Sequence, residues 1–362
     1  MRYNKKNHFF DKGGIPLKRP FLLALACALL LTGCTGPAQP THTPTSDPTA
    51  ESTTFAMDTV MTFRLYGGTE EDLTAVTSRI LSLEQDLSVT LEDSQVYALN
   101  HSGGEPVTAG EDFLALLALA KELGNRTGGA LDVTMYPVVK AWGFTTSEYH
   151  IPDEDTLSAL LANVDYTSVT VEGDQVTLPA KMELDLGAIA KGYAGEMAAN
   201  LLRERGVTSA ILNLGGNVQT VGSKADGSPW RIGVQDPQQT TGGYLGVLEI
   251  RDQAMVTSGG YERYFEEDGV RYWHIMDPHT GAPARSGLVS VTIVGDKGGL
   301  CDGLSTSLFV LGREKALDYW RTYGGFEAIL IDDQNNIWVT GGLKNNFTLV
   351  ADSPYTLNIV EE

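Results

Sequence analysis

Asp302 and Thr306, four positions apart, are the first residues of this chain whose types and spacing suggest chemistry. Residues at that separation share one face of a helix, so a carboxylate and a hydroxyl would point the same way. Together with nearby backbone carbonyls they make up the hard oxygen donors that Mg²⁺ prefers. The residues alone leave an alternative open, in which Asp302 caps a helix N-terminus and the hydroxyls are ordinary helix side chains.

The stretch from Glu183 to Tyr193 has the composition of an anion site. Asp185 is followed by small residues that favour a tight turn, and Lys191 falls in the first turns of an expected helix. Backbone N–H groups at the start of a helix attract anions, and a lysine adds a point charge there. An aspartate near a helix start beside a solvated lysine would explain the same residues.

Two further segments suggest a ligand site at turns. His274 precedes the turn-forming Asp277-Pro278, where it would serve either as a general base or as a structural group. Gly215-Gly216 follows an expected strand, and paired glycines let a ligand approach the backbone closely or simply reverse the chain. The segment is not GxGxxG, and no Walker-type GKS/T motif occurs in the chain.

Residues 127–144 are the best candidates for a flat, apolar slot. They combine Gly128-Gly129 and Asp132 with the aromatic residues Trp142 and Phe144 around Pro137. Such residues would line a pocket for a planar ring, or would form an ordinary core and turn.

The elements that must position these residues follow from the periodicity of apolar side chains. Helices are predicted after Thr69, over 111–126, after Asp155 and from about Ala188 to Gly206, and Thr69 with Asp72 resembles a capping box. Strands are predicted over 168–171, 176–178, 210–214, 230–234, 245–250, 288–294, 328–331 and 337–339. Runs of strands interrupted by isolated helices indicate an α+β fold, either as a single compact domain or as two interleaved lobes.

Composition and charge limit the class of protein. The 362 residues are 42% hydrophobic, which is enough for a large core. There are 26 basic and 46 acidic residues, and the net charge is −20. A nucleic-acid-binding protein needs a clustered basic face, so this class is excluded.

Residues 1–33 are typical of a lipoprotein signal peptide. They carry six basic residues and one acid, and the apolar run from Phe21 to Leu31 is too short for a stable membrane span. The run ends in Leu31-Thr32-Gly33-Cys34, which resembles a bacterial lipobox. The alternative is an uncleaved anchor with a chance cysteine.

Processing at this point would define three segments. We expect a signal peptide over 1–33, a Thr/Pro/Ser-rich tether with lipidated Cys34 over 34–54, and a catalytic domain over 55–362 held outside the cytoplasmic membrane. Loss of the six basic residues and one acid changes the net charge from −20 to −25. Cys301 is then the one cysteine left in the domain, as a small buried residue or as a nucleophile.

Six motifs occur in an order that resembles the ApbE family, the bacterial FAD:protein FMN transferases, over about residues 55 to 350. They are Met57-Asp58-Thr59, Gly129-Ala130-Leu131-Asp132 with Trp142-Gly143-Phe144, Asp185-Leu186-Gly187-Ala188-Ile189-Ala190-Lys191-Gly192, Asn213-Leu214-Gly215-Gly216-Asn217, His274-Ile275-Met276-Asp277-Pro278-His279-Thr280-Gly281, and Asp302-Gly303-Leu304-Ser305-Thr306.

The resemblance implies a fold, a reaction and partners. The fold would be α+β with duplicated T-fold-like elements. The reaction would be Mg²⁺-dependent transfer of the FMN moiety of FAD to a Thr or Ser hydroxyl of a target protein, with release of AMP. The targets would be flavin-carrying subunits of membrane redox complexes or extracytoplasmic flavoproteins.

The resemblance also assigns roles to residues by matching position. It implies FAD contacts from Met57, Ala130, Leu131, Asp132, Asp185, Lys191 and Met276. It implies Mg²⁺ ligands at Ala188 through its carbonyl, Asp302, Ser305 through its carbonyl, and Thr306, and catalysis by His274. Thr90 stands where many members have an aromatic residue, and Leu131 stands where Phe is common.

Two other functions fit the same motifs. A hydrolase would cleave FAD to FMN and AMP without a protein acceptor. A non-catalytic flavin-binding lipoprotein would bind FAD without turnover, although a passive binder has less need of a metal at the pyrophosphate.

Overall fold

A nine-stranded, mainly antiparallel sheet organises the chain in the computed structural model, which describes residues 47–239 and 242–361. Only its last pair of strands is parallel. In spatial order the strands are β1 (Ala50–Ala56), β2 (Thr59–Leu65), β6 (Ser209–Leu214), β7 (Asn217–Gly222), β10 (Ala254–Gly259), β15 (Leu288–Gly295), β16 (Glu327–Asp332), β17 (Asn336–Thr340) and β19 (Thr356–Val360).

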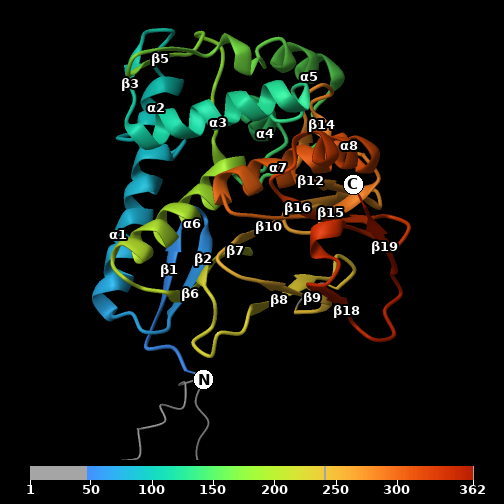
Figure 1. The fold of residues 1–362 in the computed structure, drawn as a ribbon. Coiled ribbons are helices and arrows are strands. Elements are labelled where there is room, and N and C mark those ends of the chain that lie inside the picture. The colour runs from blue at the N-terminus through green and yellow to red at the C-terminus, as the bar shows by residue number, and fades with distance from the viewer. Residues whose placement is uncertain (1–46, 240–241, 362) are drawn as a thin grey trace, which may run out of the picture. The chain divides into compact units, whose positions relative to one another are not determined.

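Helices cover one face of this sheet, as Figure 1 shows for α1, α6 and α7. Helix α7 packs on β10 and β15 and contacts α3 and α6. The helices are α1 (Glu70–Leu87), α2 (Gln95–Asn100), α3 (Glu111–Thr127), α4 (Tyr136–Ala141), α5 (Glu154–Leu161), α6 (Gly187–Glu204), α7 (Gly298–Leu311) and α8 (Arg313–Tyr323). None of the helices in the described part of the chain is both long and apolar enough to cross a bilayer.

A three-stranded sheet covers part of the opposite face. Its order is β18 (Phe347–Leu349), β9 (Tyr244–Ile250) and β8 (Trp230–Gln235). Because side chains alternate across a strand, Val256 of β10 joins the core under the helices, whereas its neighbour Met255 joins the core against β8 and β9. The central strands are therefore buried on both faces.

Smaller sheets lie around this framework. One consists of β3 (Val107–Thr108), β5 (Gln175–Thr177) and β4 (Thr170–Glu172). Two are paired strands, β11 (Tyr264–Glu267) with β12 (Val270–Trp273) and β13 (Met276–Asp277) with β14 (Ala282–Pro283). A third, separate hydrophobic cluster includes Trp142, Phe144 and Met276.

The α+β prediction is confirmed, and the four predicted helices correspond to α1, α3, α5 and α6. Thr69 and Asp72 form the predicted capping box of α1, and α3 ends at Gly128 in the left-handed conformation. The predicted hairpin at 172–175 joins β4 to β5. The described residues, 47–239 and 242–361, form one compact unit rather than two lobes.

The predicted start of the domain at residue 55 is wrong. Strand β1 begins at Ala50 and pairs with β2, so residues 50–54 belong to the sheet rather than to the tether. Backbone ladder bonds do not depend on apolar side chains, which is why a Thr- and Ser-rich run can form an edge strand. The predicted signal peptide over 1–33, Cys34 and the tether as far as residue 46 lie outside the described residues.

Candidate active site

A cavity of about 640 Å³ brings the predicted motifs together. This volume is within the range of small-molecule sites. The turn between β1 and β2, the turn between β6 and β7, the start of α6 and the middle of α7 all contribute to its wall. The predicted residues that line it are Met57, Ala130, Leu131, Asp132, Asp185, Ala188, Lys191, His274, Met276, Asp302 and Thr306.

Asp302 lies inside α7, not at its N-terminus, so the N-cap alternative is wrong. Its Oδ2 accepts a hydrogen bond of 2.7 Å from the Gly192 backbone N–H, and its Oδ1 accepts one of 3.2 Å from Asn217. Burial raises the pKa of this carboxyl, and Lys191 opposes the shift. Because Asp302 forms no salt bridge within the described residues, it is a buried carboxylate beside a cavity without a paired cation.

The two hydroxyls after Asp302 have different surroundings. Thr306 lines the cavity, one helical turn beyond the carboxylate, and Ser258 Oγ of β10 lies 3.2 Å from its Oγ1. Ser305 is fully buried and does not line the cavity. Its Oγ donates to the Asp302 carbonyl at 2.8 Å and lies 2.7 Å from Ser258 Oγ. The hydroxyl of Ser305 is thus used within the protein.

The start of α6 gives the cavity its positive side. The helix has no side-chain N-cap, and Lys191 lies in its second turn on the cavity wall. Asp185 Oδ1 accepts from the Gly187 N–H at 2.9 Å and so fixes the entry to the helix. Desolvation raises the pKa of Asp185, and Lys191 and Arg263 oppose this.

His274 lies directly after β12 and is held by one backbone carbonyl. The backbone N–H of His274 donates to the Arg263 carbonyl at 3.1 Å, and the ring Nδ1 lies 3.2 Å from the same oxygen. A carbonyl only accepts, so Nδ1 carries the proton and Nε2 keeps a free lone pair in the neutral ring. Burial lowers the pKa of His274 to about 4, and the charges of Arg263 and Lys191 act in the same direction.

Residues from the segment 127–144, which was predicted to form a slot for a planar ring, line one wall of the cavity. Leu131, Val139, Phe144 and Met276 give it an apolar surface. Trp142 does not line the cavity; its indole N–H donates to the Gly281 carbonyl at 2.8 Å inside the small hydrophobic cluster. Thr90 does line the cavity, together with Val89.

Asp132 organises this wall from within. Its Oδ1 accepts from the Thr134 backbone N–H at 2.8 Å and from the Thr134 hydroxyl at 2.6 Å, and its Oδ2 accepts from the Tyr166 N–H at 3.1 Å. The carboxylate therefore holds the loop between α3 and α4 in shape while it also borders the cavity.

The turn at Met57 and Asp58 reaches the cavity in a strained form. Both residues have positive φ, 50° and 58° respectively, which costs free energy in non-glycine residues. Glu84 of α1 accepts a 2.7 Å hydrogen bond from the Met57 N–H and holds the turn in place. Strain of this kind is typical of functional sites.

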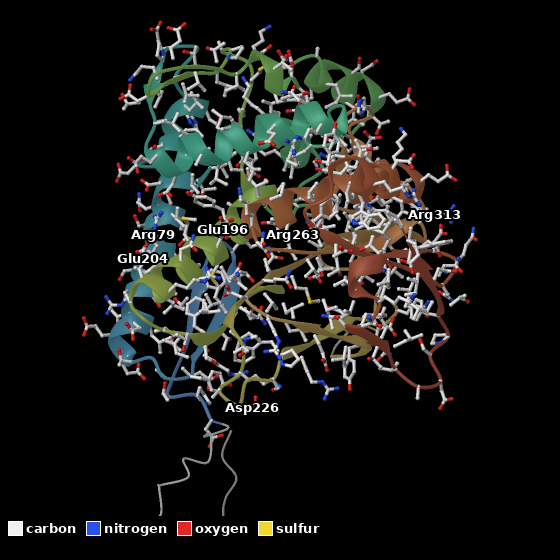
Figure 2. The ribbon with its side chains drawn as sticks, viewed as in Figure 1. Arg79, Glu196, Glu204, Asp226, Arg263 and Arg313 are labelled. Atoms are coloured by element: carbon white, nitrogen blue, oxygen red, sulfur yellow. The ribbon has the colours of Figure 1, made fainter. Side chains whose placement is uncertain are left out.

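Several cavity residues were not singled out from the sequence. They are Tyr136, Ile232, Gln235, Met255, Thr257, Ser258, Tyr261, Glu262 and Arg263. Most lie on strands or turns without a chemical pattern of their own. Figure 2 shows Arg263 near the centre of the view, whereas Asp226 and Arg313 lie towards its edge. A lone arginine beside a Tyr-rich run gave no signal that it would face His274.

Two other predictions can be compared with the structure. Cys301 is buried and burial raises the pKa of its thiol, so the nucleophile alternative is not supported. In the described part of the chain no group of three or more His, Cys, Asp or Glu side chains could hold a metal ion. A cation at Asp302 would therefore depend on one carboxylate plus hydroxyl and carbonyl oxygens.

Comparisons with known proteins give one consistent family. The profile described as "ApbE family" matches residues 57–330. The FAD:protein FMN transferase of Vibrio cholerae is 35% identical over 307 residues, which cover 83% of this chain and 90% of that protein. The FAD:protein FMN transferase of Treponema pallidum is 35% identical over 291 residues, covering 76% and 80%.

A solved structure agrees over nearly its whole length. The crystal structure of the ApbE protein from Thermotoga maritima has a TM-score of 0.76 and 29% identity, and the match covers 82% of this chain and 98% of that one. The chain therefore belongs to the ApbE family.

Proposed function

We propose that this chain transfers the FMN moiety of FAD to a Thr or Ser hydroxyl of a target flavoprotein, in a Mg²⁺-dependent reaction that releases AMP. The transferase class follows from its relatives, which are named FAD:protein FMN transferase. The observation that carries the proposal for this chain is the single cavity that collects an apolar wall, a lysine at a helix start, a buried carboxylate and a neutral histidine.

The cavity offers separate surfaces for the parts of FAD. The apolar wall with Leu131, Val139 and Phe144 fits an isoalloxazine ring. Lys191 and the N-terminal N–H groups of α6 fit the pyrophosphate, because both favour negative charge. In a chain of net charge −20, this local positive charge has to outweigh the overall field.

The residues around Asp302 fit a magnesium ion. Asp302 is buried without a paired cation, and Thr306 and Ala188 line the same cavity. Hard oxygen donors of this kind suit Mg²⁺. We propose that Asp302, Thr306 and the carbonyl of Ala188 hold the ion. Ser305, which the family resemblance adds through its carbonyl, does not line the cavity, and its hydroxyl is already hydrogen-bonded. When bound, Mg²⁺ would neutralise charge on the pyrophosphate and on the leaving AMP.

We propose that His274 takes the proton of the acceptor hydroxyl. With Nδ1 directed at the Arg263 carbonyl, Nε2 is the free acceptor of the neutral ring. The acceptor oxygen bonds to the FMN phosphorus, the bond from that phosphorus to the AMP oxygen breaks, and the hydroxyl proton goes to Nε2. Lys191 stabilises the negative charge that is shared between the phosphates.

The decisive experiment measures the mass of an acceptor protein. The chain is incubated with FAD, Mg²⁺ and a flavoprotein that carries the acceptor segment, and intact-mass spectrometry follows FMN addition while chromatography follows AMP. Transfer predicts one FMN added for each AMP released. AMP formed equally with and without acceptor would indicate a pyrophosphatase instead, and bound FAD without either product would indicate a passive binder.

We also propose that the chain acts outside the cytoplasmic membrane, anchored by a lipid on Cys34. The support is the basic segment, the short apolar run and the Leu31-Thr32-Gly33-Cys34 sequence. The test is metabolic labelling with a radioactive fatty acid in cells that express the whole chain. Label and membrane association should both be lost in Cys34→Ala; label that persists in this variant would contradict the assignment.

A further inference from the structure

Five aromatic side chains next to the cavity form a cluster in which Phe265 is central. We call Trp142, Phe144, Tyr149, Phe265 and Tyr272 the aromatic cluster. The ring of Phe265 lies 5.1 Å from Tyr149 at 11°, 5.1 Å from Tyr272 at 18°, 5.8 Å from Phe144 and 6.4 Å from Trp142. These distances are those of stacked and tilted aromatic pairs, which have preferred geometries.

The aromatic cluster is linked to His274 by two routes. The ring of Phe144 meets the His274 imidazole edge-on at 6.3 Å. Phe265 and Tyr272 face each other across the β11–β12 ladder, and the same ladder brings the Arg263 carbonyl to His274. The stacked pair therefore packs on the hairpin from which His274 and its hydrogen-bond acceptor extend.

We propose that Phe265 and Tyr149 are positioning residues that hold the His274 imidazole at the cavity wall. This inference rests on the proposed function, in which His274 takes the proton of the acceptor hydroxyl. Neither Phe265 nor Tyr149 lines the cavity, so both act through their neighbours rather than on substrate. A single hydrogen bond to the Arg263 carbonyl fixes one atom of the imidazole, and the edge contact with Phe144 fixes the plane of the ring.

The surroundings of His274 give the inference a measurable consequence. The charged groups that face the imidazole are Arg263, which precedes β11, and Lys191 of α6. Loss of a side chain from the aromatic cluster leaves these charges in place and admits water to the His274 imidazole. Less desolvation favours the protonated imidazole, so the pKa of His274 should rise from about 4 towards the ordinary 6.5.

The chain offers a control for removing an exposed tyrosine that pairs with another aromatic ring. Tyr149 is 37% exposed and stacks on Phe265, whereas Tyr323 of α8 is 47% exposed and its ring lies 4.5 Å from that of Tyr319. Neither tyrosine lines the cavity. We compare Phe265→Ala, Tyr149→Ala and Tyr323→Ala, each first checked for folding by circular dichroism and thermal unfolding.

The main readout is an NMR titration of the histidine rings in the protein without FAD or acceptor, with the His274 signal assigned from its loss in His274→Gln. Phe265→Ala should raise the pKa of His274 by about one unit or more, and Tyr149→Ala should shift it in the same direction. Tyr323→Ala should leave it unchanged. In the transfer assay, kcat for Phe265→Ala should fall roughly 10- to 100-fold, with a smaller change in the KM for FAD.

An unchanged His274 pKa in folded Phe265→Ala and Tyr149→Ala would overturn the inference, as would an equal shift in Tyr323→Ala. If Phe265→Ala does not fold, the surface variant Tyr149→Ala decides the question. The titration needs no catalysis, so a shifted His274 pKa in a chain that transfers no FMN would reject the proposed function and keep the positioning role. An unshifted His274 pKa in the folded variants, together with normal FMN transfer by the native chain, would reject the positioning role and keep the proposed function.

Discussion

Asp302 Oδ2 accepts a hydrogen bond of 2.7 Å from the backbone N–H of Gly192, and this bond ties the carboxylate of α7 to the second turn of α6. The two helices touch at this point with no side chain between them, because Gly192 faces Gly298 of α7. The cavity therefore has its buried carboxylate and its lysine on two helices whose backbones are in direct contact.

Gly192→Ala should separate α6 from α7. A Cβ on Gly192 would lie against the Gly298 carbonyl and 2.6 Å from Asp302 Cβ, so one helix must move. We expect a loss of about 1–3 kcal/mol in the free energy of unfolding, the usual cost of overpacking, and slower transfer of FMN. Urea unfolding measures the first and the transfer assay the second. The control is Glu204→Ala at the exposed end of the same helix, and equal losses in both variants would contradict the close-contact argument.

Asp302→Asn should show whether the negative charge of this side chain serves Mg²⁺ binding rather than the stability of the fold. Burial raises the pKa of Asp302 above its ordinary 3.8, so the folded chain binds this proton more readily than the unfolded chain does. The contribution of this group to stability therefore falls as pH rises from about 3.8 through the raised pKa. Without added Mg²⁺ at pH 7.5 the variant should be at least as stable as the native protein.

Magnesium supplies the contrasting measurement for Asp302→Asn. A ligand that binds only the folded state raises the melting temperature, so Mg²⁺ should stabilise the native chain and leave the variant unchanged. Transfer of FMN should be lost in the variant. An equal rise in melting temperature for both proteins would show that the ion is bound elsewhere.

Glu84→Ala should loosen the strained turn at the cavity. The Glu84 carboxylate accepts a 2.7 Å hydrogen bond from the Met57 N–H, and both Met57 and Asp58 have positive φ. Removing the acceptor leaves the strain without its support, and we expect a loss of about 1–2 kcal/mol in stability and a weaker affinity for FAD. Fluorescence titration with FAD measures the affinity. Gln85→Ala, on the exposed side of the same helix, should change neither quantity, and normal FAD binding by Glu84→Ala would show that the turn does not depend on Glu84.

The sequence predicted those elements whose local signals agree with their surroundings. Helix α1 has a capping box and an apolar stripe, and α3 ends at a glycine in the left-handed region. Strands β8 and β16 have recognisable apolar patterns bounded by turn residues. In each case the chain's own neighbours determine the structure, so a short window of sequence is enough to predict it.

Three of the elements that were missed, β7, β10 and α7, are buried on both sides or on most of their surface. Strand β7 is buried along nearly its whole length, so its side chains show no alternation, and β10 contributes to two cores at once. Helix α7 begins with Gly298-Gly299 and is buried on most of its surface, which hides the helical period. It also carries Asp302, whose spacing from Thr306 suggested a helix but gave neither its start nor its end.

The sequence predicted the residues of the site but not the groups that hydrogen-bond to them. Family motifs led to His274, Lys191 and Asp302, whereas their partners depend on tertiary contacts between distant segments. The Arg263 carbonyl reaches His274 only through the β11–β12 ladder, and Glu84 reaches Met57 from the far end of α1. Contacts of this kind leave no pattern in a single sequence.

His274→Gln should reveal the protonation state of the native histidine through stability as well as activity. Burial lowers the pKa of His274 to about 4 in the folded chain, against 6.5 for the free side chain. Between these values the unfolded chain binds the proton more readily than the folded one, so His274 makes the native protein less stable as pH falls from about 6.5 to about 4. Glutamine does not titrate, and the variant should lose this part of the pH dependence. Urea unfolding at pH 5 and pH 7.5 tests the point, with His101→Gln on α2's exposed end as the control; an identical pH dependence in native protein and His274→Gln would mean that His274 is not held neutral. The same substitution should lower the transfer rate by roughly 10²- to 10⁴-fold, the usual contribution of a general base, while FAD still binds.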